Sequence, residues 1–237
     1  MFRTNATDTQ VNHRFRIEDE LERTLSDNVD QRVAAANKLG SLGQVDAGVI
    51  PALHRLLQDQ SEVVRFSAAQ ALGKMGKAAH TCLSGLCQLL NDKNQLVRVH
   101  TALALRNIAP LPVISIQSVT VGLADYNPKV REHIAAALAK SGKAAQPALE
   151  ILCDALSDQE ESVRWYAAAA LGGMGVDAKC AVPQLVTAFM DDIDVIREAA
   201  QDALLRIEPD LNPQPIQNIY RNKRNNGDRM TGPNSDA

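Results

Sequence analysis

Apolar residues recur along this chain with a fixed period and a helical spacing. Ile50, Leu53 and Leu57 are separated by three and then four residues, so they share one face of a helix. The same kind of trio recurs four more times, 33 residues further on each time. The later trios are Leu83, Leu86 and Leu90; Ile116, Val119 and Leu123; Leu149, Leu152 and Leu156; and Val182, Leu185 and Phe189. Each trio predicts a helix with one buried face.

A second apolar series follows each trio and predicts a longer helix. An aliphatic residue such as Val64 precedes an arginine, and a leucine such as Leu72 stands seven residues after that arginine. Alanines fill most positions three, four and six after the arginine, which permits close approach of a neighbouring helix. Four repeats have a glycine eleven residues after the arginine, namely Gly43, Gly76, Gly142 and Gly175. Because glycine often ends a helix in a left-handed conformation, we expect this helix to run for about 14 residues.

Arginine and aspartate repeat with the same period of 33. The arginines are Arg32, Arg65, Arg98, Arg131, Arg164 and Arg197, and aspartates stand six residues before the last five, at Asp59, Asp92, Asp125, Asp158 and Asp191. Such regularity favours a stacked structural ladder, because a recognition site rarely needs six identical residues. We therefore predict that each aspartate steadies the turn between two helices and pairs with an arginine of its own or the adjacent repeat. The alternative is an anion-binding stripe of arginines.

These units predict a repeat architecture. A helical hairpin cannot bury its two apolar faces alone, and stacking of neighbouring hairpins provides the missing core. The sequence therefore predicts an all-α protein, an α-solenoid of about six stacked helical hairpins over residues 17–208. Residues 1–16 are expected to form a polar N-terminal arm, and residues 209–237 a mostly disordered C-terminal tail.

Three repeats depart from the pattern. In the first repeat Gln31 takes the aliphatic position, and in the last repeat Gln201 replaces an alanine. Polar substitutions at both ends are typical of capping repeats. In the third repeat Arg106 and Ala109 replace two glycines and Pro110 follows, so we expect an altered connection there.

The segments Asp59–Gly76 and Asp158–Gly175 share the pattern Asp-x5-Arg-x2-Ala-Ala-x-Ala-Leu-Gly-x-Met-Gly or a close variant of it. This pattern resembles the HEAT family, and within it the phycobilisome-lyase-type HEAT-like repeat. The Thr-Pro-Leu-His signature of ankyrin repeats is absent from the sequence. The resemblance implies a right-handed solenoid whose Val-Arg helices line the concave surface, with aspartate and arginine stacked as ladders between repeats.

Composition narrows the function classes. Apolar residues make up 45% of the chain, charged residues 22%, and the formal net charge is −3. We expect a soluble globular protein that does not bind nucleic acid, because phosphate binding normally requires an excess of Lys and Arg. The sequence contains no apolar run long enough for a membrane span, and its first ten residues are polar. Together with four cysteines that do not resemble a disulfide framework, this predicts a cytoplasmic protein without a membrane partner.

Metal and cofactor motifs are missing. His80, Cys82 and Cys87 lie close together in sequence, but the two cysteines occupy packing positions of the repeat. The chain has no C-x2-C pair, H-E-x-x-H motif or glycine-rich phosphate loop. Glu132-His133 is the nearest match to the His-Glu pairs of HEAT-like di-iron hydroxylases, and it runs in the opposite order. We expect neither a metal nor a cofactor.

Aromatic and histidine side chains gather on one face of the long helices in repeats two to five. The candidate partner-binding residues are Phe66, His100, Leu103, His133, Trp165 and Tyr166. They follow the arginines by one, two or five residues, so they would line up across packed helices about 10 Å apart. Exposed apolar surface flanked by polar residues usually marks a binding site. The alternative is that Trp165 and Phe66 only fill gaps between alanine-rich helices.

This face favours a function without catalysis. We predict a protein–protein interaction scaffold or adaptor that binds another protein or a peptide on its concave helical surface. The alternative is a bilin lyase-like or chromophore-handling protein, because the repeats resemble phycobilisome-type lyases and an aromatic and histidine groove suits a flat tetrapyrrole.

Overall fold

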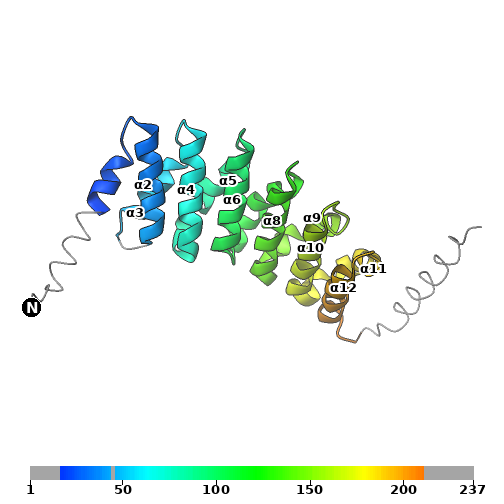
Figure 1. Cartoon of the computed structure of the whole chain (residues 1–237). Coiled ribbons are helices and arrows are strands. Elements are labelled where there is room, and N and C mark those ends of the chain that lie inside the picture. Colours follow the sequence, from blue (N-terminus) through cyan, green and yellow to red (C-terminus); the bar gives the residue numbers. More distant parts are fainter. Residues whose placement is uncertain (1–16, 44–45, 211–237) are drawn as a thin grey trace, which may run out of the picture.

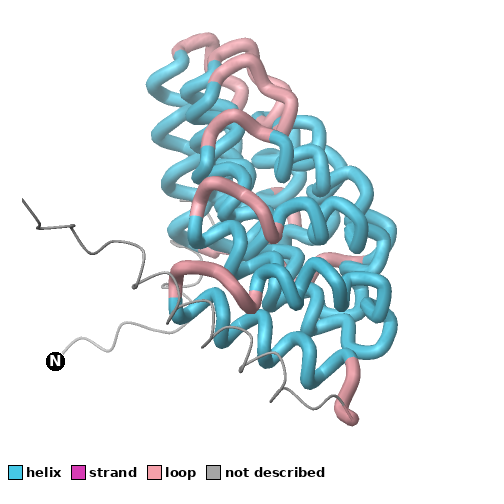
Figure 2. The backbone as a smooth tube through the Cα atoms, turned by 90° about the vertical axis from the view of Figure 1, so that its right-hand side faces the viewer, coloured by secondary structure: helices cyan, strands magenta, loops and turns pink. Residues whose placement is uncertain are grey.

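A computed structural model describes residues 17–43 and 46–210, and this part of the chain contains helices and no strand. The helices form two layers. Figure 1 shows the long helices side by side in one row, with the shorter helices behind them, and Figure 2 shows both layers from the side. The predicted arm at residues 1–16 and residues 211–237 of the predicted tail lie outside the described ranges.

The long helices each have 14 residues, as the sequence predicts. They are α2 (Val29–Leu42), α4 (Glu62–Met75), α6 (Gln95–Ile108), α8 (Pro128–Ser141), α10 (Glu161–Met174) and α12 (Asp194–Ile207). The shorter helices are α3 (Val49–Leu56), α5 (Leu83–Leu89), α7 (Val113–Val119), α9 (Leu149–Ala155) and α11 (Val182–Ala188). Each short helix precedes a long one, and helical residues 17–23 precede α2 in the same way. The described residues therefore form six hairpins, which confirms the predicted α-solenoid.

The repeating apolar positions form one continuous core. Leu72 and Leu171 are fully buried, and the equivalent leucines of the other long helices are at most 2% exposed. Small residues bring neighbouring long helices together, because a Cβ atom added to Gly73 of α4 would lie 2.8 Å from the Cα atom of Ala104 in α6. The alanine and glycine positions thus set the distance between repeats.

The long helices end where the sequence predicts. Gly43, Gly76, Gly142 and Gly175 have positive φ angles of 72°, 55°, 53° and 62°. After the last three, the chain continues directly into the 3-10 helices η1 (Gly76–Cys82), η3 (Gly142–Ala148) and η4 (Gly175–Ala181).

The third repeat has the altered connection that its sequence predicts. Ala109 ends α6 with a φ of −53°, and the Ala109–Pro110 peptide bond is cis. An extended segment leads to Pro112 before α7, and the 3-10 helix η2 (Thr120–Ala124) follows α7 instead of preceding it.

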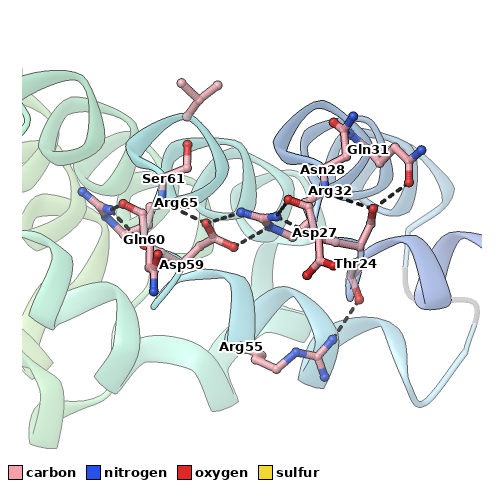
Figure 3. A network of polar contacts seen from close by, with 12 residues as sticks. Thr24, Asp27, Asn28, Gln31, Arg32, Arg55, Asp59, Gln60, Ser61 and Arg65 are labelled. Atoms are coloured by element: carbon pink, nitrogen blue, oxygen red, sulfur yellow. Dashed lines mark hydrogen bonds and ion pairs between the residues drawn. The ribbon is translucent and has the colours of Figure 1, made fainter.

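The repeating arginines link successive hairpins. Figure 3 shows Arg32 extending to Asp59 of the next repeat. In every such pair the arginine Nε donates to the aspartate Oδ2 at 2.6–2.7 Å, and its Nη2 donates to Oδ1. The pairs are Arg32–Asp59, Arg65–Asp92, Arg98–Asp125, Arg131–Asp158 and Arg164–Asp191. Arg197 of the last repeat instead pairs with Asp194 of its own helix.

The same side chains also form hydrogen bonds with backbone groups of the turn between two helices. The Nη1 atom of Arg65 donates to the carbonyl of Asp59 at 2.8 Å, so this arginine holds its own turn as well as the next one. Asp59 Oδ1 accepts a hydrogen bond of 2.9 Å from the backbone amide of Ser61. In each of these five pairs the guanidinium group already binds a carboxylate of the chain. The contacts therefore support a structural role for the ladder over an anion-binding stripe.

The arginine–aspartate pairs require ionised aspartates. Burial opposes their charge, but hydrogen bonds from the arginine and a backbone amide outweigh burial and lower the pKa of Asp59, Asp92, Asp158 and Asp191. The folded state therefore binds fewer protons than the unfolded state near the unfolded aspartate pKa of about 3.9. The resulting stabilisation is complete above that pH and is lost as the pH falls through the lower folded pKa values.

We expect Leu171→Ala to lower the free energy of unfolding by about 2–5 kcal/mol, because it leaves a cavity in the shared core. Chemical denaturation followed by circular dichroism measures this. The control is Val176→Ala, since Val176 is 54% exposed in η4 and its truncation should change stability by less than about 0.5 kcal/mol. Equal effects of the two variants would contradict the assignment of Leu171 to the core.

We expect Asp92→Asn to lower the free energy of unfolding by about 3 kcal/mol at neutral pH, because Arg65 keeps its charge without a carboxylate partner. The difference from the unmodified chain should shrink as the pH falls below about 4, where protonation weakens the same contact. Denaturation at a series of pH values tests both points. The control is Glu20→Gln, which removes the Arg23–Glu20 pair on the surface and should cost less than about 1 kcal/mol. If the stability difference between Asp92→Asn and the unmodified chain does not change with pH, the ladder does not depend on ionised aspartate.

Candidate functional site

The candidate residues lie on four consecutive long helices. Phe66 is on α4, His100 and Leu103 on α6, His133 on α8, and Trp165 and Tyr166 on α10. Five of them are half-buried, and Trp165 is 39% exposed. With Arg106 of α6, described below, we call these residues the central surface.

One ring pair joins α4 to α6. The rings of Phe66 and His100 stack with centroids 5.0 Å apart and planes inclined by 24°. Burial lowers the pKa of His100, so its neutral form is favoured. Its Nδ1 atom is buried and has no hydrogen-bond partner among the described residues. Phe66 also packs against the core, as the gap-filling alternative predicts for that residue.

Arg106 links three long helices. Its Nη2 atom donates to the hydroxyl of Tyr166 at 3.1 Å, although the two residues are 60 positions apart. Its Nη1 atom lies 3.3 Å from Nδ1 of His133, and its guanidinium carbon lies 5.6 Å from the ring centroid of Tyr166. Oε1 of Glu132 is 4.0 Å away. The side chain thus extends from α6 across α8 to α10.

The charge of Arg106 affects its histidine neighbour. A guanidinium group can only donate, so Nδ1 of His133 accepts this hydrogen bond and the proton of the neutral ring lies on Nε2. Burial lowers the pKa of His133. The negative charge of Glu132 raises this pKa, and the positive charge of Arg106 lowers it. His133 is therefore favoured as a neutral acceptor near pH 7.

Trp165 extends the central surface towards the last hairpin. Its ring meets the Tyr166 ring edge to face, with centroids 4.8 Å apart and planes at 80°. On its other side it lines a cleft of about 400 Å³ between α10 and α12. The exposure of Trp165 differs from what the gap-filling alternative predicts for this residue.

The structure groups the candidates into two sets. His133, Trp165 and Tyr166 form one cluster around Arg106, and Phe66 with His100 forms another. Leu103 is half-buried on α6 and takes part in neither ring pair.

Sequence reasoning noted Arg106 as a departure from the repeat but did not place it in the site. The sequence did contain a signal, since Arg106 stands where every other repeat has a small or apolar residue. Those residues are Gly40, Gly73, Ala139, Gly172 and Leu205. A long charged side chain departs from this column of small and apolar residues. Its length and its five donors instead allow it to bind groups on neighbouring helices.

The described residues offer little for metal or thiol chemistry. They contain no group of three or more His, Cys, Asp or Glu residues that could hold a metal ion. All four cysteines are free thiols, and burial raises the pKa of Cys87 and Cys153 to about 11. Both thiols are therefore protonated and weakly nucleophilic near pH 7. In the same part of the chain, no helix is both long and apolar enough to span a bilayer.

The stacked hairpins and the surface on their long helices define an α-solenoid repeat protein. The family model for HEAT repeats matches residues 17–106 and 116–205. The chain belongs to the HEAT-repeat family. No curated protein shows significant sequence similarity to it.

Solved structures with the same fold include designed and natural proteins. A designed armadillo repeat protein in complex with the peptide (KR)4 has a TM-score of 0.68 and 21% identity, over 81% of this chain and 99% of that one. A crystallised engineered protein has a TM-score of 0.65 and 24% identity, over 81% and 96%. The CpcE–CpcF complex of phycocyanin lyase from Nostoc sp. PCC7120 has a TM-score of 0.57 and 21% identity, over 81% and 76%.

We expect Arg106→Gln to raise the pKa of His133, because the substitution removes a positive charge beside the ring. The pKa of His100, which burial alone lowers, should stay unchanged and acts as an internal control. A histidine NMR titration of the full chain measures both values. An unchanged pKa of His133 would show that Arg106 does not lie beside it in solution.

Proposed function

We propose that the protein is a non-catalytic scaffold or adaptor that binds another protein or a peptide on the central surface. The observation that carries this proposal is the cluster of Trp165 and Tyr166 on α10 with Arg106, which extends to them from α6 across α8. Tryptophan, tyrosine and arginine are the residues most enriched among those that dominate binding energy at protein interfaces. Here Tyr166 contacts both Trp165 and Arg106, and the indole of Trp165 remains 39% exposed.

The fold agrees with this role. Stacked repeats present an extended surface to a partner, and the similar designed armadillo repeat protein was solved with a bound peptide. The resemblance to lyase-type repeats implies that the long helices line the concave side of the solenoid. A location in the cytoplasm is part of the proposal, since the four cysteines are free thiols.

The test selects binding peptides from a random display library on the full chain and measures their affinity by fluorescence anisotropy. We expect Trp165→Ala to weaken binding by about 1–3 kcal/mol, which is about 5- to 150-fold in Kd. Tyr126→Ala is the control, because Tyr126 is 99% exposed in the turn before α8 and lies outside the central surface. If the two variants bind selected peptides as tightly as the unmodified chain, the central surface is not the binding surface.

A second candidate function is the handling of a bilin. The observation in its favour is a cation, Arg106, set among aromatic and histidine rings, since a tetrapyrrole has a flat ring system and carboxylate side chains. The similarity to the CpcE–CpcF complex points the same way. Titration of biliverdin into the full chain tests it: a red-shifted absorbance band that Arg106→Gln abolishes supports this function, and an unchanged spectrum rejects it.

A further inference from the structure

The cleft between α10 and α12 adjoins the central surface at Trp165. Its base is closed by small residues, because a Cβ atom added to Gly172 would lie 2.9 Å from the Cα atom of Ala203. Trp165 lines it from α10, and Glu198, Asp202 and Arg206 line it from α12. The cleft has a volume of about 400 Å³, which is enough for one long side chain.

Two carboxylates in this cleft are available for a partner. Glu198 and Asp202 are four residues apart on α12, so they lie on the same face of that helix. Both are exposed, and neither has a hydrogen bond or an ion pair within residues 17–43 and 46–210. Arg206 lies one further turn along and forms no ion pair with either carboxylate in this part of the structure.

The two carboxylates are not a requirement of the repeat. At the equivalent positions α10 has Trp165 and Ala169, α6 has Val99 and Leu103, and α4 has Phe66 and Gln70. The helices α4, α6 and α10 therefore stack without an acidic residue at either position, and α8 has one, Glu132, at the first of them. α12 is the only long helix with an acidic residue at both, so this chemistry is confined to the cleft beside Trp165.

We propose that this cleft receives an arginine or lysine side chain of the bound protein or peptide, a proposal that rests on the function proposed above. A cation over the exposed indole of Trp165 is attracted by the negative face of the ring. The carboxylates of Glu198 and Asp202 accept charge-assisted hydrogen bonds from the same group. Arginine fits better than lysine, because its planar guanidinium group can stack on the indole while its edge donates to a carboxylate.

The indole supplies a direct readout, since Trp165 is the only tryptophan of the chain. The fluorescence of the full chain is titrated with three synthetic octapeptides, acetyl-(Gly-Arg)4-amide and its glutamine and glutamate counterparts. We expect only the arginine peptide to change the emission saturably.

Two double variants separate the cleft from general charge attraction. E198Q/D202N removes the two cleft carboxylates, and we expect it to weaken binding of the arginine peptide about tenfold. E150Q/D154N makes the same two changes at the same spacing on α9, where both residues are exposed, and it should leave the affinity unchanged. Circular dichroism confirms that both variants are folded.

Any other outcome overturns the proposal that the cleft binds a cationic side chain. Equal weakening by the two double variants shows general attraction to a chain of net charge −3. Failure of the arginine peptide to bind rejects the cleft as a cation site. If display-selected peptides still bind in a manner that depends on Trp165, the proposed function stands and only the cleft assignment fails; if none of them depends on Trp165, both fail.

Discussion

The bidentate contact between each arginine and the aspartate of the next repeat is the interaction on which the remaining structure depends. It is made five times with almost the same Nε to Oδ2 distance, 2.6–2.7 Å. Each arginine also donates to a carbonyl in the turn of its own hairpin, as Arg98 does to Asp92. One side chain therefore fixes the geometry of its own turn and the position of the next one. A guanidinium group suits this task because it is planar, has five donors and stays charged.

The ladder works together with the small residues between the long helices. Glycine and alanine positions bring the helix backbones together, as at Gly73 and Ala104, and the ladder holds the turns at the ends of those helices in register. Any insertion within a unit would move an arginine away from its aspartate. The constant period of 33 residues is the consequence of this geometric requirement.

The residues proposed for binding occupy positions that vary between repeats. Arg106 replaces a small residue of the packing column, and Trp165, Glu198 and Asp202 stand at positions whose identity the stacking does not restrict. A repeat scaffold can vary these positions at little cost in stability because they lie on the surface of the long helices. The central surface and the adjoining cleft therefore differ from repeat to repeat while the core beneath them stays the same.

The sequence by itself determined the number of hairpins, the length of the long helices and the glycines that end them. These features depend on local spacing, which a periodic sequence records directly, and repetition showed which positions are packed. It also indicated that arginine and aspartate form a ladder, but it left open whether the partner lies in the same or the adjacent repeat. Only the tertiary structure decided that each arginine extends to the next aspartate, because that choice depends on the distance between hairpins.

The contacts of the site depended still more on the tertiary structure. Sequence reasoning chose Trp165, Tyr166 and His133 from their shared helical face, but it did not join them to Arg106, which is 60 residues from Tyr166. It also did not identify the cleft beside Trp165. Both depend on how closely helices pack and where long side chains end, and these quantities are set by stacking of whole repeats and not by the spacing of residues within one of them.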